Sequence, residues 1–234
     1  DLCRCRFAVM NPELTYTLPD YQTQCGCTDI MMHTMERYFN MSENMELTDG
    51  ISEALIKTVM KHSKILKEHP DCYESRAEVM WASSLSHNDL TGCGTDGGDW
   101  ACHQLEHEIG GMFDVAHGAG LAAVWGSWAR YVYKARPERF AKFARNIFNI
   151  QETDDEKAAV AGIEAMENYY QSVGMPTSLC ELGIHATEEQ IKEMADKCSF
   201  YGKRTVGVMK KIGAPEAAEI YRMANDKSIP LYSR

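Results

Sequence analysis

Helix signals recur along most of this chain, and they constrain its fold more than any other feature. Thr187-Glu-Glu-Gln190 has the spacing of a capping box, and Pro137 suits the first position of a helix. Apolar residues between such signals repeat at helical spacing, as Ile51, Leu55 and Val59 do. The sequence therefore predicts a mainly α fold. Helices with two predicted ends cover residues 29–39 (capped by Thr28), 51–67, 73–85, 117–133 and 214–225. Another begins just before 103 and ends near 110–111, one begins with a capping box at 153–156 and stops at 174–176, and two more begin at 137 and at 187.

The one predicted exception is a short strand near the N-terminus. The residues Phe7 to Met10 read FAVM, and Asn11-Pro12 closes the run. A lone strand leaves its backbone hydrogen-bonding groups unpaired, which is unfavourable. We therefore expect this strand either to pair with another copy of the chain or to belong to a sheet that is missing here.

Composition limits the class of protein and its partners. The 234 residues are 44% hydrophobic, which is enough for one large domain with a substantial core. A net charge of −10 without a basic cluster argues against a nucleic-acid partner. The sequence has no apolar run long enough to span a membrane and no recognisable signal peptide, so no membrane association is expected.

The cysteines predict a reducing compartment. Nine cysteines are an odd number in a chain of this length, so a disulfide scaffold is not expected and a cytoplasmic location is. Two C-x-C pairs, Cys3/Cys5 and Cys25/Cys27, match the usual C-x₂₋₄-C spacing of thiolate zinc sites poorly. Free thiols, buried or at the surface, are the favoured interpretation.

The stretch HQLEHEIGGMFDVAH, from His103 to His117, has the residues of a metal site. On a helix His103 and His107 lie one turn apart on the same face. Asp29 and His33 have the same i, i+4 spacing. A carboxylate together with several imidazoles suits a divalent cation such as Zn²⁺ or Fe²⁺.

The same residues permit a second interpretation. H-x₂-E-H matches the inverted zinc-protease motif, in which His103 and His107 would bind zinc and Glu106 would activate water as a general base. This zinc metallohydrolase alternative leaves the other members of the pattern without a role. The remaining four histidines belong to no such cluster of possible ligands and are expected to be ordinary surface or core residues: His62, His69, His87 and His185.

Longer motifs carry a resemblance to a known family. The segments NPELTYTLP, TDIMMHTMERY, GDWACHQLEHEIGGMFDVAHGAGLA and RFAKFARNIFNI resemble the C-terminal helical domain of iron-containing alcohol dehydrogenases in order and spacing. The branch most similar is the NAD(P)H-dependent butanol dehydrogenase-like group. The resemblance covers nearly the whole chain and implies the dehydroquinate synthase-like fold. It implies a remnant strand and linker over residues 1–20 and a helical metal- and substrate-binding domain over residues 21–234.

The resemblance also implies roles for individual residues. Asp29, His33, His103 and His117 match the four metal ligands of the family. His107 matches a histidine that lies near the nicotinamide and the substrate, and so is the expected catalytic and cofactor-binding residue. In this interpretation Glu106 has no catalytic task.

The implied activity is that of an alcohol dehydrogenase or aldehyde reductase. It would use Fe²⁺ or Zn²⁺ together with NAD(H) or NADP(H), on a primary alcohol or aldehyde such as butanol or butanal. The family's N-terminal nucleotide-binding α/β domain has no match here, and the glycine-rich stretch TGCGTDGG follows a helix, which is wrong for a phosphate loop. We expect that stretch to be a loop near the site. The chain alone is then expected to bind metal, to turn over substrate poorly, and to self-associate, with a homodimer as the simplest case.

Overall fold

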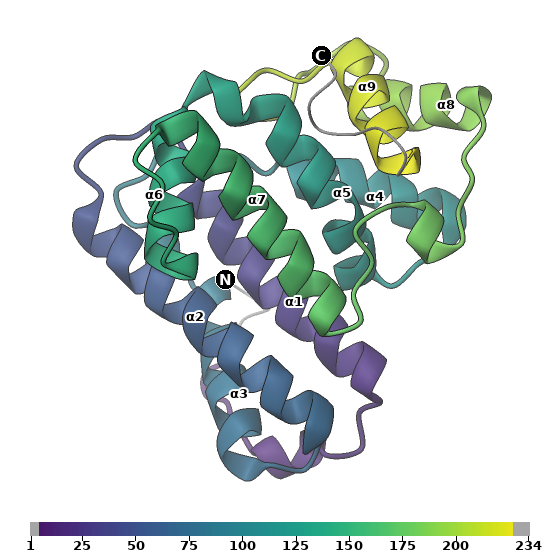
Figure 1. Ribbon diagram of the computed structural model, residues 1–234. Coiled ribbons are helices and arrows are strands. Elements are labelled where there is room, and N and C mark those ends of the chain that lie inside the picture. Colours follow the sequence, from purple (N-terminus) through teal and green to yellow (C-terminus); the bar gives the residue numbers. More distant parts are fainter. Residues whose placement is uncertain (1–4, 227–234) are drawn as a thin grey trace.

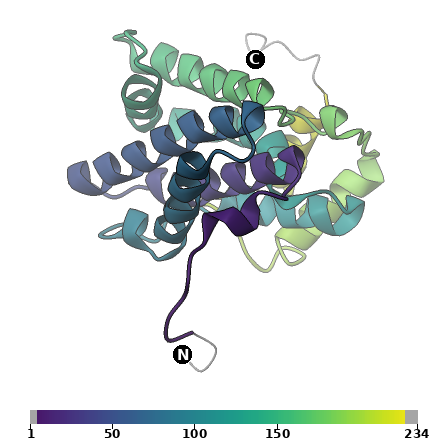
Figure 2. The ribbon, with the colours of Figure 1, turned by 90° about the horizontal axis from the view of Figure 1, so that it is seen from below.

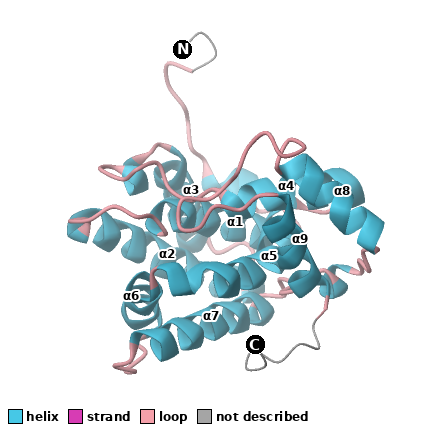
Figure 3. Ribbon diagram, turned by 90° about the horizontal axis from the view of Figure 1, so that it is seen from above, coloured by secondary structure: helices cyan, strands magenta, loops and turns pink. Residues whose placement is uncertain are grey.

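The structure of this protein is a computed structural model, which describes residues 5–226. Those residues form a mainly helical fold with no sheet, as the sequence predicts (Figure 1). The α-helices are α1 (Asp20–Tyr38), α2 (Glu46–Glu68), α3 (Tyr73–His87), α4 (Ala101–Phe113), α5 (His117–Val132), α6 (Pro137–Phe148), α7 (Asp155–Ser172), α8 (Glu188–Cys198) and α9 (Ala214–Asn225). Figure 3 shows α8 beside both α9 and α4.

The predicted strand at Phe7 to Met10 is wrong. These residues have no regular secondary structure, and the segment extends away from the helices (Figure 2). A strand exists only through hydrogen bonds to a neighbouring strand. The described residues contain one isolated antiparallel bridge, between Val206 and Ile212, and nothing for the N-terminal segment to pair with. The first regular element is instead a 3₁₀ helix at Pro12–Thr15.

Several helix boundaries differ from the sequence prediction. Helix α1 begins at Asp20, and Thr28, predicted to be its N-cap, lies fully buried inside it. Burial of apolar side chains over the whole length of α1 outweighs the local capping preference of one threonine. The N-cap of α7 is Asp154, which accepts a hydrogen bond from the backbone N–H of Lys157, and not the predicted Thr153. The capping box at Thr187–Gln190 and the proline at the start of α6 are confirmed.

Helix α1 lies at the centre of the molecule. It packs against α2, α3 and α5, so that side chains from three directions cover it (Figure 1). Helix α5 is buried along nearly its whole length. The largest fully buried side chains include Trp125, Trp128, Tyr38, Phe39, Phe140 and Phe143. Burial of these aromatic side chains removes a large apolar area from water and so stabilises the fold.

A close approach of α1 and α5 depends on Gly118. A Cβ atom at this position would lie 2.1 Å from the backbone oxygen of Cys25, which is too short for any contact. The glycine therefore lets the first turn of α5 rest directly on the backbone of α1. Because His117 precedes Gly118, this contact brings its imidazole beside α1.

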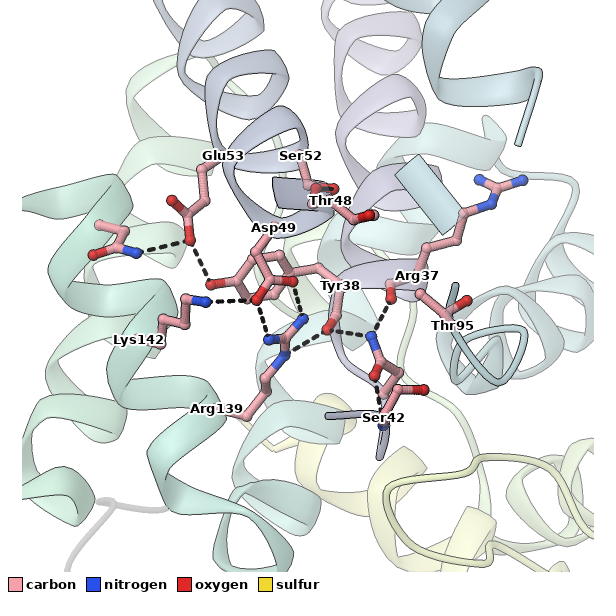
Figure 4. A network of polar contacts seen from close by, with 12 residues as sticks. Arg37, Tyr38, Ser42, Thr48, Asp49, Ser52, Glu53, Thr95, Arg139 and Lys142 are labelled. Atoms are coloured by element: carbon pink, nitrogen blue, oxygen red, sulfur yellow. Dashed lines mark hydrogen bonds and ion pairs between the residues drawn. The ribbon is translucent and has the colours of Figure 1, made fainter. Parts of the chain in front are cut away.

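A buried polar network joins the C-terminal end of α1 to α2 and α6 (Figure 4). Arg139 of α6 forms a bidentate ion pair with Asp49 of α2, and Lys142 contacts the same carboxylate. Arg139 also donates to the backbone oxygen of Tyr38, whose hydroxyl donates to Glu53. The network fixes the end of α1 without using any residue of the predicted metal site.

The cysteines of the described residues are free thiols. Cys25 and Cys27 lie buried in α1, and burial raises the pKa of Cys27 to about 12. A thiol of that pKa stays protonated and does not favour metal binding. Cys3, which belongs to the other C-x-C pair with Cys5, lies outside the described residues. Among residues 5–226, no helix is both long enough and apolar enough to cross a membrane.

Candidate metal centre

Three helices contribute the predicted ligands. Asp29 and His33 lie one turn apart on α1, His103 lies in the first turn of α4, and His117 is the first residue of α5. Helices α1 and α4 each pack against α5, as Figure 1 shows. The fold therefore brings four residues from distant parts of the sequence into one place.

The carboxylate of Asp29 is the common point of this arrangement. Its Oδ1 atom lies 3.6 Å from Nε2 of His33, 3.5 Å from Nε2 of His103 and 3.6 Å from Nε2 of His117. Donor atoms of Asp29, His33 and His103 all lie within 4.8 Å of one another. Three imidazoles thus present the same ring nitrogen to one carboxylate oxygen.

Two of these donor atoms are buried and have no hydrogen-bond partner. They are Oδ1 of Asp29 and Nε2 of His103. Buried polar atoms without a partner are costly, and a native protein rarely keeps them unless another group satisfies them. A divalent cation between these atoms would satisfy both, so the residues present fit such an ion.

Burial and neighbouring charges shift the pKa values of the residues at the site. Burial by itself raises the pKa of Asp29, but contacts with His103, His33 and His117 outweigh it and the net pKa is lowered. Burial lowers the pKa of His33 to about 4. Burial also lowers that of His103, but Asp29 and Glu36 reverse the effect and raise its pKa to about 9. The site thus holds an ionised carboxylate, a neutral His33 and an imidazole under strong negative influence.

Two glutamates contact the outer nitrogens of the imidazoles. Nδ1 of His103 lies 3.1 Å from Oε1 of Glu36, which also accepts the backbone N–H of His103 at 3.0 Å. Nδ1 of His117 is hydrogen-bonded to Oε2 of Glu106. Glu36 was not predicted from the sequence, although its position three residues after His33 places it on the same face of α1.

His107 lies next to this arrangement but outside it. Its ring centroid is 6.4 Å from that of His103 and 5.7 Å from that of His117. It belongs to a second group, with Glu106 and His117, whose ligand atoms lie within 4.8 Å of one another. His107 is exposed, whereas Glu106 is 1% exposed. The hydrolase interpretation needs Glu106 to reach water, and the burial of its carboxylate does not favour that.

The rim of the site contains two further aromatic residues, His87 and Trp100, that no sequence pattern predicted. Nε2 of His87, at the end of α3, lies 3.9 Å from Oδ2 of Asp29, and its ring centroid lies 3.9 Å from that of His33. Trp100 lies 5.5 Å from the ring of His33 and 5.4 Å from that of His103. Trp100 follows two residues after the glycine-rich stretch, which forms a loop after a short 3₁₀ helix at Leu90–Gly92.

Three of the four histidines that were expected to be ordinary residues, His62, His69 and His185, lie outside the candidate site. His62 bonds to Ser75, and His185 contacts Cys180. Neither they nor His69 belong to either group of possible metal ligands in the described part of the chain. His87 alone among the four lies at the site, and no spacing rule links position 87 to the histidines of α1 or α4.

Comparison with known proteins identifies the family. Residues 23–224 match the Fe-containing alcohol dehydrogenase family, C-terminal region. The chain belongs to this family, which confirms the resemblance and the mainly helical fold.

Individual relatives of this chain are named as butanol dehydrogenases and as an aldehyde reductase. NADH-dependent butanol dehydrogenase A of Clostridium acetobutylicum is 36% identical over 224 residues, which cover 95% of this chain and 57% of that protein. The NADPH-dependent aldehyde reductase YqhD of Escherichia coli is 32% identical over 219 residues, covering 93% of this chain and 56% of that protein. The crystal structure of NADH-dependent butanol dehydrogenase A from Thermotoga maritima matches with a TM-score of 0.86 at 36% identity, covering 92% of this chain and 55% of that one. The chain therefore spans little more than half the length of these relatives.

Proposed function

We propose that this chain is the metal-binding part of an alcohol dehydrogenase or aldehyde reductase, and that Asp29, His33, His103 and His117 hold one divalent cation. The observation that carries the proposal is the convergence of three Nε2 atoms on Oδ1 of Asp29 at 3.5 to 3.6 Å. One carboxylate and three imidazoles suit Fe²⁺ and Zn²⁺. The relatives named for NADH- or NADPH-dependent reactions supply the reaction class.

A cation held here would act as a Lewis acid that polarises the oxygen of a primary alcohol or an aldehyde such as butanol or butanal. The residues of this chain supply the other conditions of the reaction. The partly exposed side chains of Asp29 and His117 leave one side of the site open to a small molecule. Burial of Glu36 and Glu106 keeps water away from the opposite side. Hydride would pass between the substrate carbon and a nicotinamide, NAD(H) or NADP(H).

His107 is proposed as the catalytic and nicotinamide-facing residue. It is exposed beside the candidate centre, 5.7 Å from the ring of His117, and is not among the donors around Asp29. Partial desolvation lowers the pKa of His107, so that its imidazole is neutral near pH 7. A neutral imidazole in this position can accept a proton from an alcohol or orient a nicotinamide ring.

The experiment that tests the function uses the full chain loaded with Co²⁺, whose visible spectrum reports the ligands of the cation. Addition of 1-butanol or butanal is expected to change the spectrum in a saturable way, while a dipeptide leaves it unchanged. An unchanged spectrum with both butanol and butanal would contradict the proposal. A change produced by the peptide alone would favour the hydrolase.

Two parts of the proposal concern the chain on its own. Among residues 5–226 there is no α/β unit that would hold a dinucleotide, so we expect the metal-loaded chain to oxidise NADH or NADPH with butanal slowly or not at all.

Apolar side chains such as Phe7, Val9 and Leu14 are 83%, 84% and 78% exposed. Exposed apolar groups of this kind favour self-association. Sedimentation at several protein concentrations should show a mass above that of one chain.

A further inference from the structure

Two buried glutamates lie behind the imidazoles of the candidate centre. Glu36 is 2% exposed and Glu106 is 1% exposed, and neither belongs to the donor set around Asp29. Fully buried glutamates are rare unless they are paired. The partner of each is the Nδ1 side of an imidazole, His103 for Glu36 and His117 for Glu106. The two glutamates therefore have the same relation to the site.

The space around Glu106 is shaped for its carboxylate. A Cβ atom at Gly120 would lie 2.6 Å from Oε1 and 2.8 Å from Cγ of Glu106, and one at Gly110 would lie 3.0 Å from Oε1. Only glycine at position 120 leaves room for the side chain. Helix α5 therefore provides both His117 and the gap that lets Glu106 of α4 reach it.

The hydrogen bonds determine which ring nitrogen carries the hydrogen atom. An ionised carboxylate only accepts hydrogen bonds, so Nδ1 of His117 must donate to Glu106. In the neutral imidazole Nε2 then keeps its lone pair, and this is the nitrogen that lies 3.6 Å from Oδ1 of Asp29. The same holds for His103, whose Nδ1 faces Glu36 and whose Nε2 faces Asp29. In its neutral form each ring thus turns a lone pair toward the point where the donors converge, and a cation bound there displaces the proton that Nε2 of His103 otherwise carries.

We propose that Glu106 and Glu36 are positioning residues, which hold His117 and His103 in the tautomer and orientation that direct Nε2 at the cation. The proposal rests on the proposed function, because it assigns a task to residues around the same site. It replaces the general-base role that the H-x₂-E-H pattern would give to Glu106 with a structural one. Carboxylates in this position raise the basicity of a ligating imidazole and fix its ring.

The test measures Zn²⁺ affinity of the full chain by competition with a chelator. The variants are Glu106→Ala, Glu106→Gln and Glu36→Gln, with Glu53→Gln as the matched control. Glu53 is also a buried glutamate, at 8% exposed, but its hydrogen bonds within residues 5–226 come from Tyr38 and Asn146 and not from an imidazole. Thermal unfolding of the metal-free variants runs in parallel, so that lost stability is separated from lost affinity.

Loss of the Glu106 carboxylate should weaken Zn²⁺ binding by about 10- to 100-fold. Glu106→Gln and Glu36→Gln should lose less, because an amide oxygen still accepts the Nδ1 hydrogen bond. Glu53→Gln should keep the wild-type affinity even where it lowers the unfolding temperature. Wild-type affinity in Glu106→Ala would overturn the positioning role and leave the proposed function standing. A wild-type chain that binds no Zn²⁺ would instead overturn the proposed function itself.

A second measurement needs no variant and so does not depend on the folding of Glu106→Ala. Nitrogen-15 spectra of the Zn²⁺-loaded wild-type chain distinguish the two ring nitrogens of each histidine. His103 and His117 should carry hydrogen on Nδ1 and bind the cation through Nε2. A spectrum with hydrogen on Nε2 of His117 would overturn the proposal.

Discussion

Oδ1 of Asp29 lies 3.6 Å from Nε2 of His117, although Asp29 is in the middle of α1 and His117 is the first residue of α5. The close packing of α5 on α1 at Gly118 produces this contact. The same oxygen lies near Nε2 of His33 and of His103. A single carboxylate oxygen therefore collects imidazoles from three helices, which is the relation that the proposed metal site requires.

The first prediction separates His117 from His107. His117→Ala removes a nitrogen that faces Asp29 and should weaken Zn²⁺ binding by at least about a hundredfold, since each ligand contributes a large part of the binding free energy. His107→Ala leaves the donors around Asp29 intact and should change the affinity by less than about threefold. Chelator competition on both variants measures this. A large loss in His107→Ala together with little loss in His117→Ala would favour the zinc-hydrolase ligand set.

The second prediction concerns pH. The pKa of His103 is about 9, because the carboxylates of Asp29 and Glu36 outweigh the effect of burial, so the proton on Nε2 competes with the cation below that pH. Metal affinity should rise by up to about tenfold per pH unit toward pH 9 and then level off. His33, with a pKa of about 4, contributes no such change near neutrality.

Calorimetry checks the second prediction directly. Titration with Zn²⁺ at pH 7, in buffers of different ionisation enthalpy, should show release of about one proton from His103. An affinity that is constant between about pH 6 and pH 9 would contradict it. In the metal-free chain the same raised pKa contributes stability that is complete below pH 6.5 and is lost as pH rises through about 9.

The third prediction tests the packing that brings His117 to α1. Gly118→Ala would place Cβ 2.1 Å from the backbone oxygen of Cys25, so α5 must move away from α1. We expect a loss of stability of about 1–3 kcal/mol or more, and weaker metal binding. Gly26→Ala, within α1 and with no atom within 4 Å of its Cβ, should instead stabilise the chain by about 0.5–1 kcal/mol. Denaturant unfolding compares the two, and equal stability would refute the close contact.

The fourth prediction concerns the buried ion pair of Figure 4. Arg139 and Asp49 have side chains that are 6% and 3% exposed, so Arg139→Met leaves a buried carboxylate with Lys142 as its remaining charged partner. The free energy of unfolding should fall by about 3–5 kcal/mol. Arg222→Met, which breaks the solvent-screened pair with Glu188 at the surface, should lower the free energy of unfolding far less than Arg139→Met does. Urea unfolding at neutral pH measures both, and a small loss in Arg139→Met would show that the pair is not desolvated.

Sequence patterns predicted the helices well because they are local. Pro137, the Thr187–Gln190 capping box and the range 214–225 gave correct helix positions, since each signal depends on a few neighbouring residues. The start of α1 was wrong because long-range burial decides it. The strand at Phe7 to Met10 failed because a strand needs a partner, and apolar composition alone does not provide one.

Residue spacing together with the family resemblance predicted the four candidate ligands, but not the residues that surround them. Asp29 with His33, and His103 with His107, each follow from one helical turn. The spacing does not show which histidines converge, and the resemblance supplied that choice. Glu36 reaches the site by its contact with His103 of α4, and His87 by the packing of α3 against α1, and no local pattern contains either contact. The positioning role proposed for Glu106 depends on the space that Gly120 leaves, which becomes visible only in three dimensions.

The most direct measurement is the anomalous scattering of crystals of the full chain grown with Zn²⁺ or Fe²⁺. We predict one strong peak in each chain, bound by Asp29, His33, His103 and His117 at about 2.0–2.2 Å. His107 and the buried cysteines should not contact the ion. A peak bound by His103 and His107 without Asp29, or no ordered ion between α1, α4 and α5, would contradict the proposed centre.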